Sequence, residues 1–556
     1  MATGFNPYRR QAVHWRAGWD IGLLAYRNQG RNVLILCPEK EQIAGAGMVL
    51  GLFGKKTDHP LAEMKSAQAL LDDIPKGDSL RALQEISDWV ETLREQADDF
   101  RVDHQWEVLC PYDQAAQAPV RKLLHDYFAP QAPSQFQENR LWTLLDEYYM
   151  RSELCHFDVL TRYRDGAKGA ASIKEDVPLL CARGIHAITG RLKMAAARYA
   201  MVDPALWRRL AAFYTLAESH DCLETPLTLY AGTNTTVAQS FATLVLWYGS
   251  SAGNLSPLQE HIAERLFAAL GSGAAISRSY DGAGLFAFDL AQPTPPMRAT
   301  AGATVHPALR FVAADGQRQR LADLLKNLDK GILPEGLNFY GAKYEVEQVR
   351  EVAQRLWQSL TLPPPTRRTP RRKIKVNLKV ANGFSKMLER SDVGLSFGAE
   401  ESEVWEIEDI SATGFRSVIP MGRANGIRIA SLLGSQPDGV SHWGAGVVRR
   451  LSRDLDGNLH IGIELLSPRI VGVPLLDYAN PDESGVQIGM YLNRPNDNSG
   501  EAWLLMKQDA FVANRSLKME LGDKEYLLLP LALVEQGEDY DLARYRMMEQ
   551  DAGSED

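Results

Sequence analysis

The stretch RRTPRRKIKVNLK, residues 367–379, decides how the second half of this chain folds. It carries seven cations and no acidic residue. From residue 374 on, apolar side chains alternate with polar ones, Ile374, Val376 and Leu378 against Lys375, Asn377 and Lys379. A period of two is typical of a half-buried β-strand. The stretch therefore predicts an arginine-rich segment that runs directly into a strand.

A domain boundary lies just before this stretch. Apolar residues at helical spacing form one face of a predicted helix: Val346, Val349, Val352, Leu356 and Leu360. The helix must end before Pro363-Pro364-Pro365, because proline cannot continue a helix and favours a stiff, extended backbone. The pattern is strand-rich after the prolines, to about residue 535, and mainly helical before them.

The helical part has clear start signals. Asp203-Pro204 predicts an N-cap followed by proline at the first helical position. The segment that begins at Ser256 predicts a capping box. The spacing of Leu80, Leu83, Ile86, Val90 and Leu93 predicts an amphipathic helix. Residues 284–290 and 308–312 alternate instead and predict two strands.

A second motif, Asp409-x-Ser411-x-x-Gly414, lies between two further strand-like runs. Asp and Ser are ordinary turn residues, and glycine allows a positive φ and close backbone approach. A carboxylate can also accept hydrogen bonds from N–H groups, whereas arginine offers a flat fork of donors that binds phosphates or purine edges. The two motifs together are more specific than either one alone.

The pair resembles the PilZ domain, a bacterial receptor module for cyclic di-GMP with the signature R-x-x-x-R followed by [D/N]-x-S-x-x-G. The resemblance covers residues 363–470. It implies an antiparallel β-barrel that binds the dinucleotide through Arg367, Arg368, Arg371, Arg372, Asp409, Ser411 and Gly414. The segment GFSKMLERSDVGLSFGAEESE separates the motifs more widely than is usual in this family.

The predicted fold is an α+β multidomain chain, with a mainly helical N-terminal region before a PilZ-like antiparallel barrel and an additional β segment. The expected divisions are a mixed α/β region at 1–110, a mainly helical output region at 111–360, the barrel at 361–470, and the β segment with an acidic tail at 471–556.

Composition excludes several functions. A net charge of −9 argues against general DNA binding. No apolar run approaches the ~18–20 residues that span a bilayer, and the first residues do not resemble a signal peptide. The five cysteines lack metal-site spacing and predict reduced thiols. We therefore expect a cytoplasmic protein with no metal, no cofactor and no membrane insertion.

Two further motifs favour ordinary structural roles. Gly249-Ser250-Ser251-Ala252-Gly253 matches G-x-S-x-G, but the nucleophile elbow needs a strand before it and a helix directly after it. Here the preceding residues predict the end of a helix. His220-Asp221-Cys222 has no placed catalytic partner and predicts a helix-end cluster.

The sequence favours a non-enzymatic cyclic di-GMP receptor that signals to a protein partner through residues 1–360, by reorientation of that region against the barrel. Two alternatives stay open. The barrel could lack ligand and act as a protein–protein adaptor, or residues 1–360 could hold an enzyme gated by the barrel.

Overall fold

The computed structural model describes residues 59–550 and a short strand pair, β1 (Arg27–Asn28) with β2 (Arg31–Asn32). Short segments within 59–550 lie outside the described residues: 130–133, 252, 272, 281, 283, 301–305, 334–336, 338–343, 364–369, 392–401, 421–422, 424–425, 455, 480–485 and 495–498. Among the described helices, none combines the length and apolar character needed to cross a membrane.

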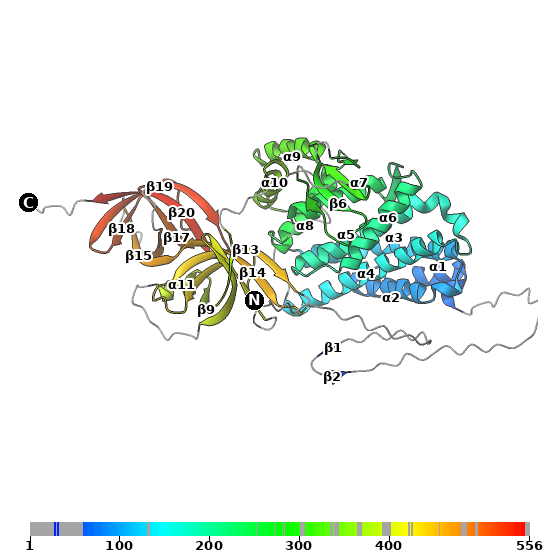
Figure 1. The fold of residues 1–556 in the computed structure, drawn as a ribbon, viewed down its shortest axis with the longest axis horizontal. Helices are drawn as coiled ribbons and strands as arrows, with labels where there is room; N and C mark the ends of the chain where they lie inside the picture. The colour runs from blue at the N-terminus through cyan, green and yellow to red at the C-terminus, as the bar shows by residue number, and fades with distance from the viewer. Residues whose placement is uncertain are drawn as a thin grey trace, which may run out of the picture. The chain divides into compact units, whose positions relative to one another are not determined.

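Long helices build the first part of the described chain (Figure 1). They are α1 (Met64–Asp72), α2 (Ser79–Glu95), α3 (Val102–Tyr127), α4 (Gln135–Arg164), α5 (Val177–Ala197), α6 (Pro204–Ser219), α7 (Val237–Ser251) and α8 (Pro257–Leu270), with 3₁₀ turns at Pro60–Ala62, Ala97–Asp99 and Ala170–Asp176. The predicted signals are confirmed. The Asp203 side chain caps α6, Ser256 and Gln259 form a capping box on α8, and the apolar face from Leu83 to Leu93 is buried in α2.

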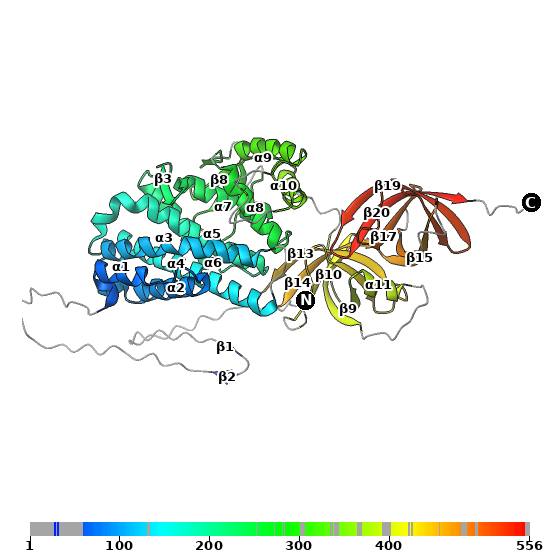
Figure 2. The same ribbon diagram turned by 180° about the vertical axis from the view of Figure 1, so that it is seen from behind.

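A hairpin and a small sheet complete this region. The hairpin joins β3 (Leu227–Tyr230) to β4 (Thr233–Thr235), and β3 contacts α5; Figure 2 shows it from behind. The sheet has the order β5-β8-β6-β7, from β5 (Ala275–Ser277), β6 (Gly284–Asp289), β7 (Met297–Arg298) and β8 (Leu309–Ala313). Helices α9 (Asp315–Leu328) and α10 (Val346–Thr361) follow. The strands predicted at 284–290 and 308–312 and the helix predicted before the prolines are confirmed.

The arginine-rich stretch leads into a closed antiparallel barrel with the order β10-β11-β14-β13-β12-β9. Its strands are β9 (Arg372–Asn382), β10 (Glu403–Ser411), β11 (Gly414–Ile419), β12 (Leu432–Pro437), β13 (Gly444–Arg453) and β14 (Leu459–Ser467). The insertion between the two motifs contains the short helix α11 (Phe384–Arg390). Apolar side chains from all six strands fill the barrel, with Trp405, Phe415 and Ile461 among them. We refer to it as the first barrel.

The additional β segment is itself a second closed antiparallel barrel, with the order β15-β16-β17-β20-β19-β18. Its strands are β15 (Arg469–Asp477), β16 (Gln487–Asn493), β17 (Glu501–Lys507), β18 (Leu517–Leu521), β19 (Lys524–Gln536) and β20 (Tyr540–Gln550). When the strands of each barrel are counted from its own first strand, both barrels have the same circular order, 2-3-6-5-4-1. The second barrel thus repeats the topology of the first.

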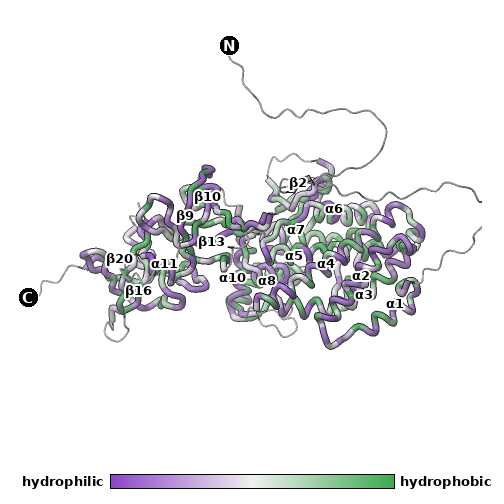
Figure 3. The backbone as a smooth tube through the Cα atoms, turned by 90° about the horizontal axis from the view of Figure 1, so that it is seen from below, coloured by the Kyte–Doolittle hydropathy of each residue, from purple (hydrophilic) through white to green (hydrophobic). Residues whose placement is uncertain are grey.

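Four apolar cores hold these parts together. One runs through the helical region, and each barrel has its own interior core. The fourth joins side chains of both barrels, including Met387, Trp443, Met490 and Tyr540. Figure 3 shows apolar segments gathered within the helical region and alternating with polar ones along the barrel strands. The predicted fold class, helices followed by antiparallel β-barrel structure, is confirmed.

Candidate functional site

The structure brings the two sequence motifs into contact at one end of the first barrel. Arg371 immediately precedes β9, and Asp409 lies near the end of β10. These strands are paired, with Asp409 opposite Lys373. Arg371 Nη1 donates to Asp409 Oδ1 at 2.8 Å, so residues 38 positions apart form one ion pair. Strand pairing, set by the apolar alternation after residue 373, creates this contact.

The turn after Asp409 is a tight hairpin between β10 and β11. The Ser411 hydroxyl donates to the Gly414 carbonyl oxygen at 3.0 Å, which closes the turn. Of the two properties of glycine considered for this turn, positive φ is not used, because Gly414 is an extended residue of β11. Glycine is required there by close approach: a Cβ at this position would lie 2.1 Å from the Ile463 carbonyl oxygen of β14.

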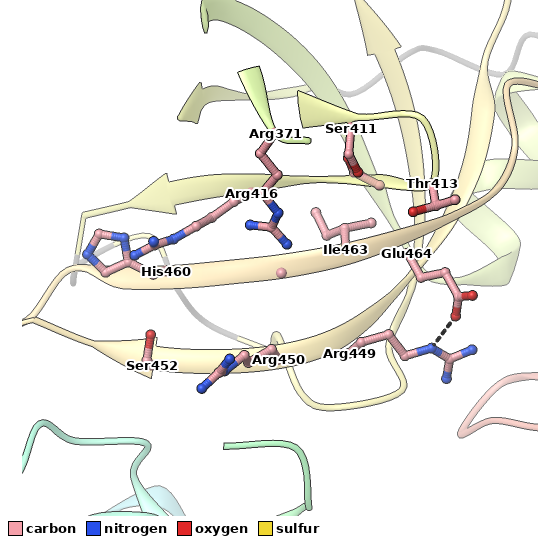
Figure 4. Close-up of a pocket in the computed structure, with 12 residues that line it drawn as sticks. Arg371, Ser411, Thr413, Arg416, Arg449, Arg450, Ser452, His460, Ile463 and Glu464 are labelled. Carbon is pink, nitrogen blue, oxygen red and sulfur yellow. Dashed lines mark hydrogen bonds and ion pairs between the residues drawn. The ribbon is translucent and has the colours of Figure 1, made fainter. Parts of the chain in front are cut away.

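Beside this hairpin, a pocket of about 500 Å³ opens on the first barrel. Figure 4 shows its lining, which comes from the Arg371 segment, the hairpin, β11, β13 and β14. The lining residues are Arg371, Ser411, Thr413, Gly414, Arg416, Arg449, Arg450, Ser452, His460, Gly462, Ile463 and Glu464. Four arginines stand against one glutamate, an excess of three positive charges in a chain whose net charge is −9.

Strand register explains why these cations gather. Arg416 of β11 and Arg450 of β13 both pair with Gly462 of β14, which lies between them. Directly opposed residues on adjacent strands project to the same face of a sheet. Because Gly462 has no side chain, the two guanidinium groups flank an open floor. Ser452 and His460 form the next pair on the same face of β13 and β14. The pocket thus lies on the outer face of the barrel.

A bulge places a further arginine at this face. The register of β13 against β14 shifts between Val448 and Arg450, so Arg449 is the extra residue. Arg449 donates to Glu464 at 2.7 Å and to both carboxylate oxygens of Glu535 in the second barrel at 2.6 Å. Burial would lower the pKa of Arg449, but these bonds raise it above its ordinary value. Arg449 is fixed by acids, whereas Arg450 has no ion pair with any described residue.

An acidic network holds the opposite rim. Glu408 Oε2 accepts from Arg416 Nε at 2.8 Å and lies 3.1 Å from His460 Nδ1. His460 Nε2 lies 3.2 Å from Asp454 Oδ2. A hydrogen bond from Asn458 is the main cause that holds the pKa of Asp454 below its ordinary value, so this carboxylate stays ionised. These contacts orient Arg416 and His460 along the pocket.

The sequence candidates therefore have different positions. Arg371, Ser411 and Gly414 line the pocket, and Asp409 adjoins it through Arg371. Arg372 pairs with Ile410 and does not line the pocket. Arg367 and Arg368 lie outside the described residues. Sequence reasoning missed Arg416, Arg449, Arg450 and His460. The signal that could have found these residues is the alternation along the strands, which places polar side chains on one outer face.

The other two motifs lie at the ends of helices. Helix α7 continues through Gly249 and Ser250 to Ser251, so no strand precedes the G-x-S-x-G match. His220 is the C-cap residue of α6, and its Nδ1 lies 3.0 Å from the Leu216 carbonyl oxygen. No group of three or more His, Cys, Asp or Glu residues suited to a metal ion occurs in the described part of the chain.

A protein-family model matches part of the chain. It is described as the cyclic-di-GMP receptor FimW, N-terminal domain, and it matches residues 65–279. That segment covers the helices from α1 to α8 and ends before the first barrel. The similarity therefore lies in the N-terminal part, not in the residues 363–470 that carry the PilZ resemblance. Searches of curated proteins and of solved structures found no match to the chain.

Proposed function

We propose that this chain is a non-enzymatic receptor for cyclic di-GMP and that the pocket of the first barrel holds the dinucleotide. The main support is the way in which the structure combines the two sequence motifs. The Arg371–Asp409 ion pair and the Ser411–Gly414 hairpin border a pocket lined by four arginines and one glutamate. The similarity of residues 65–279 to the N-terminal domain of a cyclic-di-GMP receptor supports the same ligand independently.

The pocket chemistry matches both parts of the ligand. Cyclic di-GMP has two anionic phosphates, and Arg416 and Arg450 can form charge-assisted hydrogen bonds to phosphate oxygens. Its guanines present O6 and N7 acceptors, which arginine binds bidentately, and N1–H and N2–H donors, which need a carboxylate. Asp409 is the carboxylate next to the pocket. The volume of about 500 Å³ lies within the range of small-molecule sites.

The Arg371–Asp409 ion pair suggests how the ligand engages. In this structure, Arg371 and Asp409 neutralise each other, with 2.8 Å between Nη1 and Oδ1. A guanine edge that donates to Asp409 would release the Arg371 guanidinium toward O6, N7 or a phosphate. The ligand therefore replaces one internal ion pair by two contacts of its own. This exchange requires both an arginine and an acid. The first motif supplies Arg371 and the second supplies Asp409.

Binding would act on the helical region through two connections. One is the segment between α10 and β9 that contains the triproline and Arg367, much of which lies outside the described residues; we expect its arginines to contact the ligand and so couple binding to the helical region. The other is β13 itself. Leu451 N–H donates to the Gly253 carbonyl oxygen at 3.2 Å, and Arg453 N–H donates to that of Tyr199 at 2.6 Å. A shift of β13 on binding would change these contacts. Binding would in this way be transmitted to the helical region and to its protein partner.

Calorimetric titration of two neighbouring variants tests the assignment. We expect Arg371→Ala to weaken binding at least tenfold, because a charge-assisted hydrogen bond contributes about 1.5–3 kcal/mol and each 1.4 kcal/mol is about tenfold. Arg371→Lys should also bind weakly, since an ammonium lacks the planar fork. Arg372→Ala is the matched control and should stay within about threefold of the unmodified protein. Unchanged binding by Arg371→Ala would contradict the assignment.

A further inference from the structure

The helical region contains a second cavity, of about 460 Å³, that the dinucleotide proposal does not use. Its walls come from α3, α4, α5, the β3–β4 hairpin, α7 and α8. Residues from six elements far apart in the sequence thus surround one space. A cavity of this size lies toward the low end of the volumes known for small-molecule sites.

The cavity carries an excess of positive charge. Three cations line it, Arg121, Lys193 and Arg265, against one acid, Glu264. Lys193 Nζ donates to Glu264 Oε2 at 2.6 Å, and the Lys193 side chain is only 6% exposed. Burial would raise the pKa of Glu264, but Lys193 and Arg265 lower it, so the carboxylate stays ionised. The lining therefore has two more positive than negative charges, although the chain as a whole is acidic.

Polar side chains that lack a hydrogen-bond partner among the described residues line the same space. The side chains of His186, Gln239 and Thr243 make no hydrogen bond to any residue that the structure describes. Burial lowers the pKa of His186, so its ring is neutral and offers one donor and one acceptor. Half-buried polar groups that converge on a cavity without partners are the groups a polar ligand would bind.

One wall is held rigidly. The Tyr230 hydroxyl donates to Asp113 Oδ2 at 2.8 Å, and Tyr148 donates to the other oxygen of this buried carboxylate at 2.9 Å. The Tyr230 ring contacts His186 edge-on, with centroids 5.1 Å apart. This chain of contacts fixes the hairpin and the imidazole before any ligand arrives. A preformed wall lowers the conformational cost of binding.

We propose that this cavity binds a small organic anion, a carboxylate or phosphate monoester that also carries hydroxyl groups. The excess of cations would balance the anionic group, and His186, Gln239 and Thr243 would recognise the hydroxyls. The site is separate from the pocket of the first barrel and gives the receptor a second chemical input. The charge of the lining disfavours cations, and its polar groups disfavour apolar ligands.

Thermal unfolding and calorimetry of the full chain test this site with three probes: citrate, ribose 5-phosphate and uncharged ribose. At about 5 mM, at least one of the two anions should raise the Tm by roughly 2 °C or more, through preferential binding to the folded state. Ribose should have no effect. A response to citrate alone or to ribose 5-phosphate alone would identify the anionic group.

A matched pair of variants locates the effect. Thr243→Met fills the cavity without changing its charge and should weaken binding of the anion at least about tenfold. Thr92→Met makes the same change on α2, outside the cavity, and should bind normally. Both variants should unfold cooperatively without ligand. The absence of a shift with both anions, or equal shifts for the two variants, would overturn the proposal.

Discussion

Replacing Arg416 and Arg450 together by glutamate is expected to abolish dinucleotide binding. The two guanidinium groups flank Gly462 and supply half of the arginines in the pocket. The double variant would leave two arginines against three glutamates. Losing two charge-assisted bonds of about 1.5–3 kcal/mol each corresponds to roughly 10²–10⁴-fold weaker binding, before repulsion of the phosphates is counted. Calorimetry with cyclic di-GMP measures this loss directly.

Two controls separate the site from general electrostatics. Lys507→Glu with Arg546→Glu makes the same change in net charge on the second barrel, and should bind as the unmodified protein does. Arg450→Glu alone should still cost at least about tenfold. It breaks no ion pair among the described residues, whereas Arg416 binds Glu408. Equal losses for the two double variants would mean that only diffuse charge attracts the ligand.

The stability of the helical region is expected to fall as the pH rises, because one of its carboxyl groups is buried. Glu260 of α8 is 2% exposed, and burial raises its pKa from 4.5 to about 8, with Ser251 and Trp247 only partly offsetting this. Between these values the folded state keeps the proton and the unfolded state releases it. Stability therefore falls as the pH rises from about 4.5 to 8, by on the order of 5 kcal/mol from this group.

Glu260→Gln should remove this dependence, because glutamine has a similar shape and no charge. Urea unfolding at about pH 5 and pH 8.5 would show the variant gaining several kcal/mol over the unmodified protein at the higher pH, and little at the lower. Both proteins contain the same other titratable groups, so the difference between their stabilities reports on residue 260 alone. Parallel stability profiles for the two proteins would contradict the assignment of a protonated Glu260.

The sequence predicted the elements and the site residues that are specified by local patterns. Alternation after residue 373 predicted β9, and the caps at Asp203 and Ser256 predicted the starts of α6 and α8. Arg371, Ser411 and Gly414 were found because a short motif contains them. The ion pair of Arg371 with Asp409 joins two motifs on adjacent strands, so it follows from one strand pairing.

The features of the site and fold that local patterns did not predict depend on contacts between strands that are distant in the sequence. Arg416, Arg450 and His460 meet only because β14 lies between β11 and β13, an order that no local pattern encodes. The second barrel is closed by the pairing of β15 with β18, about forty residues apart, so its sequence indicated only additional strands. Its identical circular strand order is likewise visible only in three dimensions. The excess of positive charge in the pocket is a property of this packing.

Hydrogen–deuterium exchange of the full chain, with and without saturating ligand, shows whether the first barrel binds cyclic di-GMP at this pocket. We expect slower exchange in residues 411–416, 447–453 and 459–464, and no change in the second barrel away from Glu535. No change anywhere would remove the receptor assignment and favour the adaptor. Protection confined to residues 65–279, the segment similar to the FimW N-terminal domain, would place the dinucleotide in the helical region and contradict the pocket.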